Sequence, residues 1–174
     1  SAIPGAAKSL THIKTLTASS SSTLSFVNGS SDVVLDSTYP IYLFKFINIH
    51  TSADAAFSFN LSADTGSNYN VTKTTTIFRA RHREDGSNGA LTYDPGGEDI
   101  AQGTGFQNIA TVMGTDNDQS ASGTLMLFNP SSTTFVKHFL TTANTYRSSD
   151  YSAEEFTAGY GNTTSAVDAV QFKM

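Results

Sequence analysis

The chain has 174 residues, of which 38% are hydrophobic and 14% charged, and its formal net charge is -5. This length fits one domain with a sizeable core. The absence of cysteine excludes disulfide scaffolds, thiol nucleophiles, zinc ribbons and iron–sulfur clusters, and the acidic balance argues against nucleic acid as a partner. Low charge combined with about a quarter Ser and Thr favours an extracellular or virion-type all-β protein over a cytosolic helical enzyme.

Alternation of apolar and polar residues predicts short strands along most of the chain. The expected strands cover residues 23–27, 41–50, 55–61, 71–81, 122–128, 133–140, 156–161 and 166–174. Asn28-Gly29 is a turn signal, residues 129–132 predict a hairpin, and residues 162–165 are expected to join a final pair of strands. The only helical turn expected is at residues 150–155, where Ser152 could cap it with Glu155 three residues on.

Many short strands with frequent turns predict an all-β, single-domain, antiparallel β-sandwich of jelly-roll type. We expect this domain to span residues 10–174, after an extended N-terminal arm at residues 1–9 that lacks the features of a signal peptide. The apolar stretch at residues 39–49 is too short to cross a membrane. Residues 41–50 are apolar on both faces, which is typical of a central strand or of one buried at an interface. Residues 83–105 form a long glycine-rich loop, a feature that usually serves binding or assembly.

Two loops are candidate ligand sites. Gly96-Gly97 and Gly103-x-Gly105 lack the lysine and the following helix that a phosphate-binding loop needs. Asp116-Asn117-Asp118 could offer oxygen ligands to calcium, but Ala121 and Leu127 occupy the positions where an EF-hand has Gly and Glu. A polar turn between a strand that ends near Met113 and one that starts near Ser122 is the favoured interpretation of this segment, and a lectin-like calcium loop stays open.

Charged residues on alternating positions suggest a second kind of site. Arg79, Arg81 and Arg83 share one face of a strand, with His82 opposite. They could bind phosphate, sulfate or an acidic sugar, but we favour a row that protects a sheet edge or pairs with carboxylates on a neighbouring subunit. Glu84, Asp85 and Glu98 are near in sequence.

No catalytic constellation is recognisable. Glu154 and Glu155 point apart in a strand, so they cannot form the acid pair of a glycosidase with each other. His12, His50, His82 and His138 have no metal-ligand spacing, and no nucleophile elbow is present. We therefore expect no enzyme activity, no metal and no cofactor.

Several tyrosines are expected in or near loops, beside Asn and Asp. They are Tyr93, Tyr146, Tyr151 and Tyr160. Such residues suit a protein interface, which we favour, and they also suit stacking on a sugar.

Four segments carry a resemblance to a known family. They are residues 15–26 (TLTASSSSTLSF), 78–85 (FRARHRED), 125–139 (LMLFNPSSTTFVKHF) and 158–174 (AGYGNTTSAVDAVQFKM). These segments resemble virion structural proteins of tailed bacteriophages, especially marine ones. Members of that family continue beyond the position of Met174 into a glycine-rich turn and another strand. If such a strand follows here, the sheet edge beside residues 166–174 is expected to be unpaired.

The resemblance implies a virion protein at the particle surface, acting by non-covalent assembly with other capsid or tail proteins. A capsid decoration subunit is favoured over a tail fibre, and a homo-oligomer, by analogy a homotrimer, is expected. The alternative is a carbohydrate-binding, receptor-recognising module of a tail fibre. A polysaccharide depolymerase is a weaker third hypothesis. Neither nucleic acid nor membrane is an expected partner.

Overall fold

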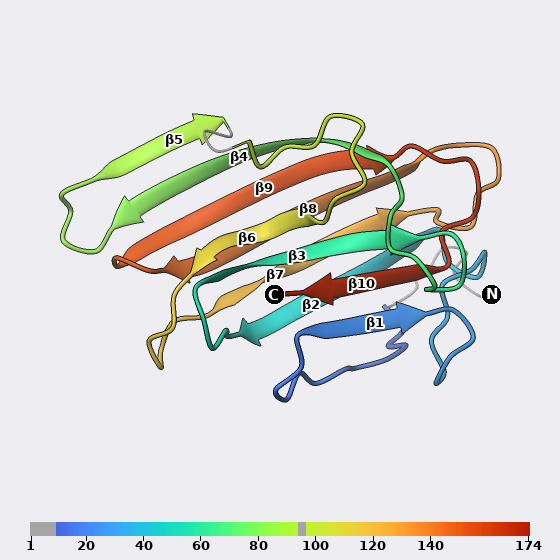
Figure 1. Cartoon of the computed structure of the whole chain (residues 1–174), viewed down its shortest axis with the longest axis horizontal. Coiled ribbons are helices and arrows are strands. Elements are labelled where there is room, and N and C mark those ends of the chain that lie inside the picture. Colours follow the sequence, from blue (N-terminus) through green and yellow to red (C-terminus); the bar gives the residue numbers. More distant parts are fainter. Residues whose placement is uncertain (1–9, 94–96) are drawn as a thin grey trace, which may run out of the picture.

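The computed structural model describes residues 10–93 and 97–174, and the expected N-terminal arm lies outside them. Ten strands run through the described residues, none of which is helical (Figure 1). Their bounds are β1 Thr23–Val27, β2 Ile41–Ile49, β3 Ala55–Ser62, β4 Lys73–Arg83, β5 Gly89–Tyr93, β6 Gln107–Met113, β7 Ala121–Phe128, β8 Lys137–Arg147, β9 Tyr151–Gly161 and β10 Ala169–Lys173. No helix that could cross a membrane occurs in this part of the chain.

The strands form two antiparallel layers. One layer has the order β1-β10-β3-β6, and the other has the order β2-β7-β8-β9-β4-β5. Figure 1 shows the first layer in front of β2 and β7. The layers meet along one side, where Met113 of β6 is paired with Arg147 of β8.

This order is that of a jelly roll with one insertion. If the β8–β9 hairpin is left out and the strands are renumbered, the layers read 1-8-3-6 and 2-7-4-5, the two sheets of the eight-stranded jelly roll. The expected all-β sandwich of jelly-roll type is therefore confirmed. The β8–β9 hairpin widens the second layer to six strands. The first layer, which covers it, has four strands.

Aromatic rings join the two layers in the core. Phe172 of β10 lies 5.0 Å from Phe46 of β2, and Phe59 of β3 lies 5.0 Å from Phe139 of β8, centroid to centroid. Both contacts are edge-on, which is a favoured geometry for aromatic pairs. The inner residues Leu61, Ile109 and Leu125 complete this core and are fully buried. Alternation of inward apolar residues along β2, β3 and β7 thus fixes which faces of the sheets meet.

Several expectations about single elements were wrong. Residues 150–155 are not a helical turn, since residues 151–155 form the start of β9. The long loop expected at residues 83–105 contains β5. The strand expected to end near Met113 is β6, whose start at Gln107 was not predicted. Residues 133–136 precede β8 and do not belong to it. The last two strands are not a pair, because β9 lies between β8 and β4 while β10 lies between β1 and β3.

The sequence predicted that β2 is either a central strand or a strand buried at an interface, and the first of these two interpretations was wrong. Among the described strands it pairs only with β7, and it is therefore an edge strand of this sheet and not a central one. Its second apolar face is open, since Ile41 is 49% exposed and Leu43 36% exposed. By contrast, β10 is paired on both sides, so its edges are not free in this structure.

Candidate functional site

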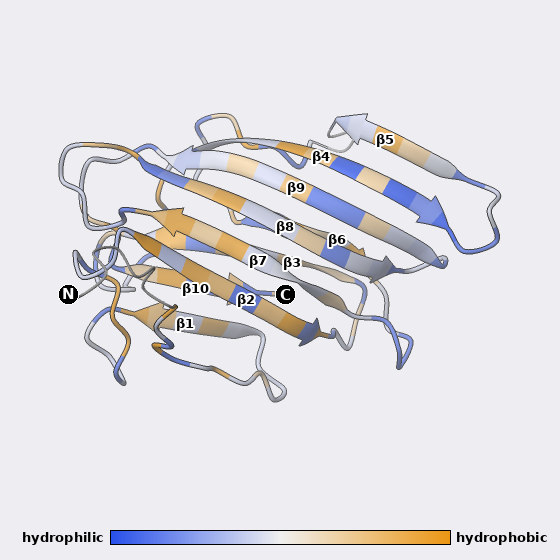
Figure 2. Ribbon diagram, turned by 180° about the vertical axis from the view of Figure 1, so that it is seen from behind, coloured by the Kyte–Doolittle hydropathy of each residue, from blue (hydrophilic) through white to orange (hydrophobic). Residues whose placement is uncertain are grey.

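The outward-facing side of the second layer is the first candidate site, and we call it the outer face. Its outward residues come from β2, β7, β8, β9, β4 and β5, seen from behind in Figure 2. One row across it pairs Leu43 with Met126, Met126 with Leu140, Leu140 with Ala158, and Ala158 with Thr76. The rows are thus made of apolar side chains and hydroxyls.

Aromatic residues form the next row of the outer face. Phe156 of β9 stacks on Phe78 of β4 with ring centroids 4.8 Å apart, and Phe78 is paired with Tyr93 of β5. Phe78 and Leu140 are each 44% exposed, and Tyr93 is 62% exposed. Between these rows lies a hollow of about 250 Å³, which the side chains of Met126, Leu140, Phe78 and Phe156 help to line. No described element of the chain packs over this surface.

Charge is scarce on the outer face. Among its described outward residues, only Lys45 on β2 and Glu154 on β9 carry a charge, histidines counted as neutral. Six strands about 4.8 Å apart and up to eleven residues long cover roughly 800–900 Å². That is about the area each partner contributes to a standard protein–protein interface.

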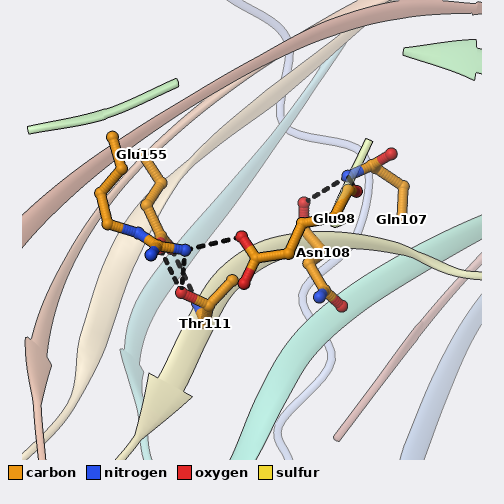
Figure 3. A network of polar contacts seen from close by, with 6 residues as sticks. Glu98, Gln107, Asn108, Thr111 and Glu155 are labelled. Carbon is orange, nitrogen blue, oxygen red and sulfur yellow. Dashed lines mark hydrogen bonds and ion pairs between the residues drawn. The ribbon is translucent and has the colours of Figure 1, made fainter. Parts of the chain in front are cut away.

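A buried ionic network is the second candidate site (Figure 3). Arg79 of β4 donates from Nε to Glu155 Oε1 and from Nη2 to Glu98 Oε2, both over 2.6 Å. Arg79 Nη2 also donates to Thr111 Oγ1 over 2.6 Å. The backbone N–H of Thr111 donates to Glu155 Oε2 over 2.7 Å, and the Thr111 hydroxyl donates to Glu155 Oε1. Gln107 extends the network by donating to the Glu98 carbonyl oxygen over 3.0 Å.

The groups of this network differ in burial. Glu155 is fully buried and Arg79 is 6% exposed, whereas the Glu98 side chain is 19% exposed. Each carboxylate is held by a charge-assisted hydrogen bond, which is what makes a buried charge tolerable. Glu98 and Glu155 both pair with the Arg79 guanidinium, which is therefore the link between the two carboxylates.

Two buried lysines lie at the other end of the same inner face. Lys73 of β4 and Lys137 of β8 are both paired with Gly161 and both fully buried. Lys73 Nζ donates to Asn60 Oδ1 over 2.5 Å and to the Val71 carbonyl oxygen over 2.9 Å. Burial lowers the pKa of Lys73 to about 8, and it lowers the pKa of Lys137 as well. Neither amine forms an ion pair with a described carboxylate.

The three predicted arginines share one face, as expected, but they do not protect a sheet edge. β4 lies between β9 and β5, so that interpretation was wrong. Arg79 pairs with Glu98, and Arg83 lies 3.6 Å from Asp85, so both carboxylates belong to the same chain and not to a neighbouring subunit. Arg81 forms no ion pair with a described residue and lies over the ring of Tyr151, 5.2 Å from its centroid.

The four predicted tyrosines do not converge on one groove. Tyr146 and Tyr160 lie on the outer face at opposite ends of β8 and β9, and Tyr93 lies on β5. Tyr151 faces inward beneath Arg81 and Arg83. Tyrosine stacking on a sugar would therefore involve single residues of this set.

The remaining sequence candidates occupy ordinary turns and loops. Asp116 and Asp118 lie in the turn between β6 and β7, where Gln119 N–H donates to the Asp116 carbonyl oxygen over 2.9 Å. The described residues contain no group of three or more acidic or histidine side chains placed to hold a metal ion. Gly96 lies outside the described residues, and Gly103 exchanges two backbone hydrogen bonds with Lys73. The loop after β5 therefore runs along β4 and supplies Glu98 to Arg79.

No pattern in the sequence pointed to Thr111, Gln107, Asn60 or Arg147. All four are buried and polar. Thr111 finds its partners Arg79 and Glu155 on β4 and β9, which are distant in the sequence. Comparison of the chain with known proteins finds no match to a family model, to a curated protein or to a solved structure.

Proposed function

We propose that this chain is a structural subunit of a bacteriophage particle that assembles non-covalently through its outer face and carries out no catalysis. The observation that supports assembly is the outer face itself, an uncovered six-stranded surface of apolar side chains and hydroxyls with two charged residues. Large uncovered apolar patches on globular proteins mark interaction sites. The phage context rests on the resemblance of four segments to virion proteins, and within it we favour capsid decoration.

The open face of β2 supports the same proposal. A strand with two apolar faces is expected in the centre of a sheet or at an interface, and β2 is at a sheet edge. Its exposed residues Ile41 and Leu43 continue the apolar rows of β7 and β8. A partner that covers the outer face would bury them.

Self-association and binding to the particle test the proposal. Leu140→Lys places a charge in the middle of the outer face, whereas Phe135→Lys changes an equally apolar residue in the turn before β8, 69% exposed. Sedimentation velocity and binding to undecorated capsids should show assembly by the native chain and by Phe135→Lys, and its loss in Leu140→Lys. Equal assembly by both variants would refute the role of the outer face. Antibody-labelled electron microscopy of intact particles should place the chain on the capsid, and label at the tail tip would refute decoration.

A carbohydrate-binding module is the second candidate. A hollow of about 410 Å³ at one end of the outer face is lined in part by Tyr160, His138 and Thr74. The Tyr160 and His138 rings meet edge-on with centroids 6.1 Å apart, and a ring beside hydroxyls suits a sugar. A glycan array on which the native chain binds and Tyr160→Ala does not would support this candidate, and an array without hits would refute it.

A further inference from the structure

Two arginines beside the ionic network have no ionic partner. Arg81 Nε and Arg147 Nη1 are buried, and neither atom has a hydrogen-bond partner among the described residues. The guanidinium groups of both residues take part in none of the ion pairs found in this part of the chain. Arg147 is only 8% exposed. A buried cationic N–H donor without an acceptor is costly, so each of these atoms needs an explanation.

The donors surround one small residue. Arg81 of β4 is paired with Ala153 of β9, and Ala153 is paired with Thr145 of β8. Arg147 lies one inward position beyond Thr145 on the same face of β8. The hydroxyl of Thr145 is also buried without a partner, and Ala153 is fully buried. The residues that carry these three unpaired donors are therefore neighbours of Ala153 in the register of the strands, and the methyl group of Ala153 is the smallest side chain that a non-glycine residue can place there.

The charges around this position do not balance. Among the residues that the structure describes, Arg79, Arg81 and Arg147 lie near Glu98 and Glu155, which places three cations beside two carboxylates. Burial lowers the pKa of Arg147, and the neighbouring charges of Arg79 and Arg81 lower it further. One buried positive charge is in excess, since Arg83 at the rim is offset by Asp85 at 3.6 Å.

We propose that Arg81, Arg147 and Thr145 bind a small monovalent anion of chloride size over Ala153. Such an ion accepts hydrogen bonds from all three donors and cancels the excess charge of the cluster. The depth of Arg147 favours a free ion over an acidic group carried on a polymer, because a 92% buried side chain admits only a small ligand. Tyr151 covers the rim of the site, with the Arg81 and Arg83 guanidinium carbons 5.2 and 5.8 Å from its ring centroid.

Bromide, which replaces chloride and scatters anomalously, is the probe for the position of the ion. Crystals of the full chain grown in sodium bromide should show an anomalous peak within hydrogen-bond distance of Arg81 and Arg147. In solution, the thermal midpoint is measured against sodium chloride, with sodium gluconate holding the ionic strength constant. An ion that binds only the folded chain raises the midpoint as its concentration rises.

Three variants separate specific binding from a general salt effect. Arg147→Gln removes the positive charge of the buried arginine, and Thr145→Val removes a hydroxyl without changing the shape of the side chain. Each should weaken the apparent affinity for chloride by about tenfold or more, the value of one charge-assisted hydrogen bond. Lys45→Gln removes a positive charge from the outer face and should keep the native response. Thr145→Val alone decides the outcome if Arg147→Gln does not fold.

The proposal is overturned if all variants respond to chloride as the native chain does, because the rise in thermal midpoint is then a general effect of salt and not of a bound ion. It is also overturned if bromide shows no peak over Ala153. No bromide peak is the result expected if water molecules, and not an ion, accept the hydrogen bonds of these donors. A peak over Ala153 together with a response that is lost in Thr145→Val supports the site.

Discussion

Lys73 allows a sharp test of how the interior holds its charges. Its amine is fully buried, it donates to Asn60 Oδ1 and to the Val71 carbonyl oxygen, and its pKa falls from 10.5 to about 8 because burial disfavours the charged form. A pKa that is lower by about 2.5 corresponds to about 3 kcal/mol of differential stability. The folded protein bears this cost at neutral pH, where the amine is charged in both the folded and the unfolded chain.

The sign of the pH dependence follows from proton binding. Between pH 8 and pH 10.5 the unfolded chain holds a proton on Lys73 that the folded chain has already released. The free energy of unfolding therefore rises with pH across this window, by about 3 kcal/mol in total. Below pH 8 this contribution is constant.

Lys73→Met removes this titration and keeps most of the side-chain volume. At pH 7 the variant escapes the cost of the buried charge but takes one hydrogen bond from each of two buried oxygens, a loss of about 1–3 kcal/mol for an oxygen left without a donor, so the net change should be about 1–2 kcal/mol or less. Asn60 Oδ1 retains one donor, the Leu61 N–H at 2.9 Å, which limits the loss. The pH profile is consequently more informative than the stability at any one pH.

Urea unfolding followed by far-UV circular dichroism from pH 7 to pH 10.5 measures the effect. The native chain should gain about 3 kcal/mol more across this window than Lys73→Met does. Lys45→Met, an exposed lysine on the outer face, should follow the native profile. Lys137 is common to all three proteins and cancels in the comparison. Parallel profiles for the native chain and Lys73→Met would refute the argument.

Two further predictions concern the interior and can be measured by the same unfolding assay. Arg79→Leu leaves Glu155 buried without its ion pair and should lower stability by about 3–5 kcal/mol, whereas Arg147→Gln, which removes an unpaired cation, should change it by about 1 kcal/mol or less in chloride-free buffer. A similar large loss in both variants would contradict this contrast. Gly123→Ala places a Cβ 2.3 Å from the Thr142 carbonyl oxygen and should cost about 1–3 kcal/mol, while Gly105→Ala meets no atom within 4 Å and should be neutral. Equal stability of these two variants would show that β7 and β8 can separate without cost.

The strands that were predicted correctly are those whose inward residues are apolar. The bounds of β1 were found, and those of β2, β3 and β7 were found to within one residue. In β6 the inward positions include Gln107 and Thr111, which serve the ionic network, so no apolar alternation marks the strand. In β9 the inward positions include Glu155, which together with Ser152 imitates a helix cap. Period-two patterns fail where a strand places polar groups inside.

The candidate sites could be predicted only in part, for a related reason. The alternation of Arg79, Arg81 and Arg83 showed that they share a face, and Glu98 is close enough in sequence to be considered as a partner. Glu155 is 76 residues from Arg79, and only the register of β4 with β9 brings the two together. The outer face likewise depends on the insertion of the β8–β9 hairpin between β7 and β4, which no local pattern reveals.

The distribution of charge over the two sides of the second layer argues for assembly. Its inner side holds Lys73, Arg79, Lys137, Arg147 and Glu155, all of them buried. Its outer face carries two charged residues and leaves Phe78 and Leu140 half-exposed. A subunit that worked alone in water would gain stability from the reverse arrangement, since burying charge and exposing apolar surface both cost free energy. The arrangement is consistent if the outer face is covered in the assembled particle, because a surface with little charge can then lie against a neighbour without leaving ions unpaired.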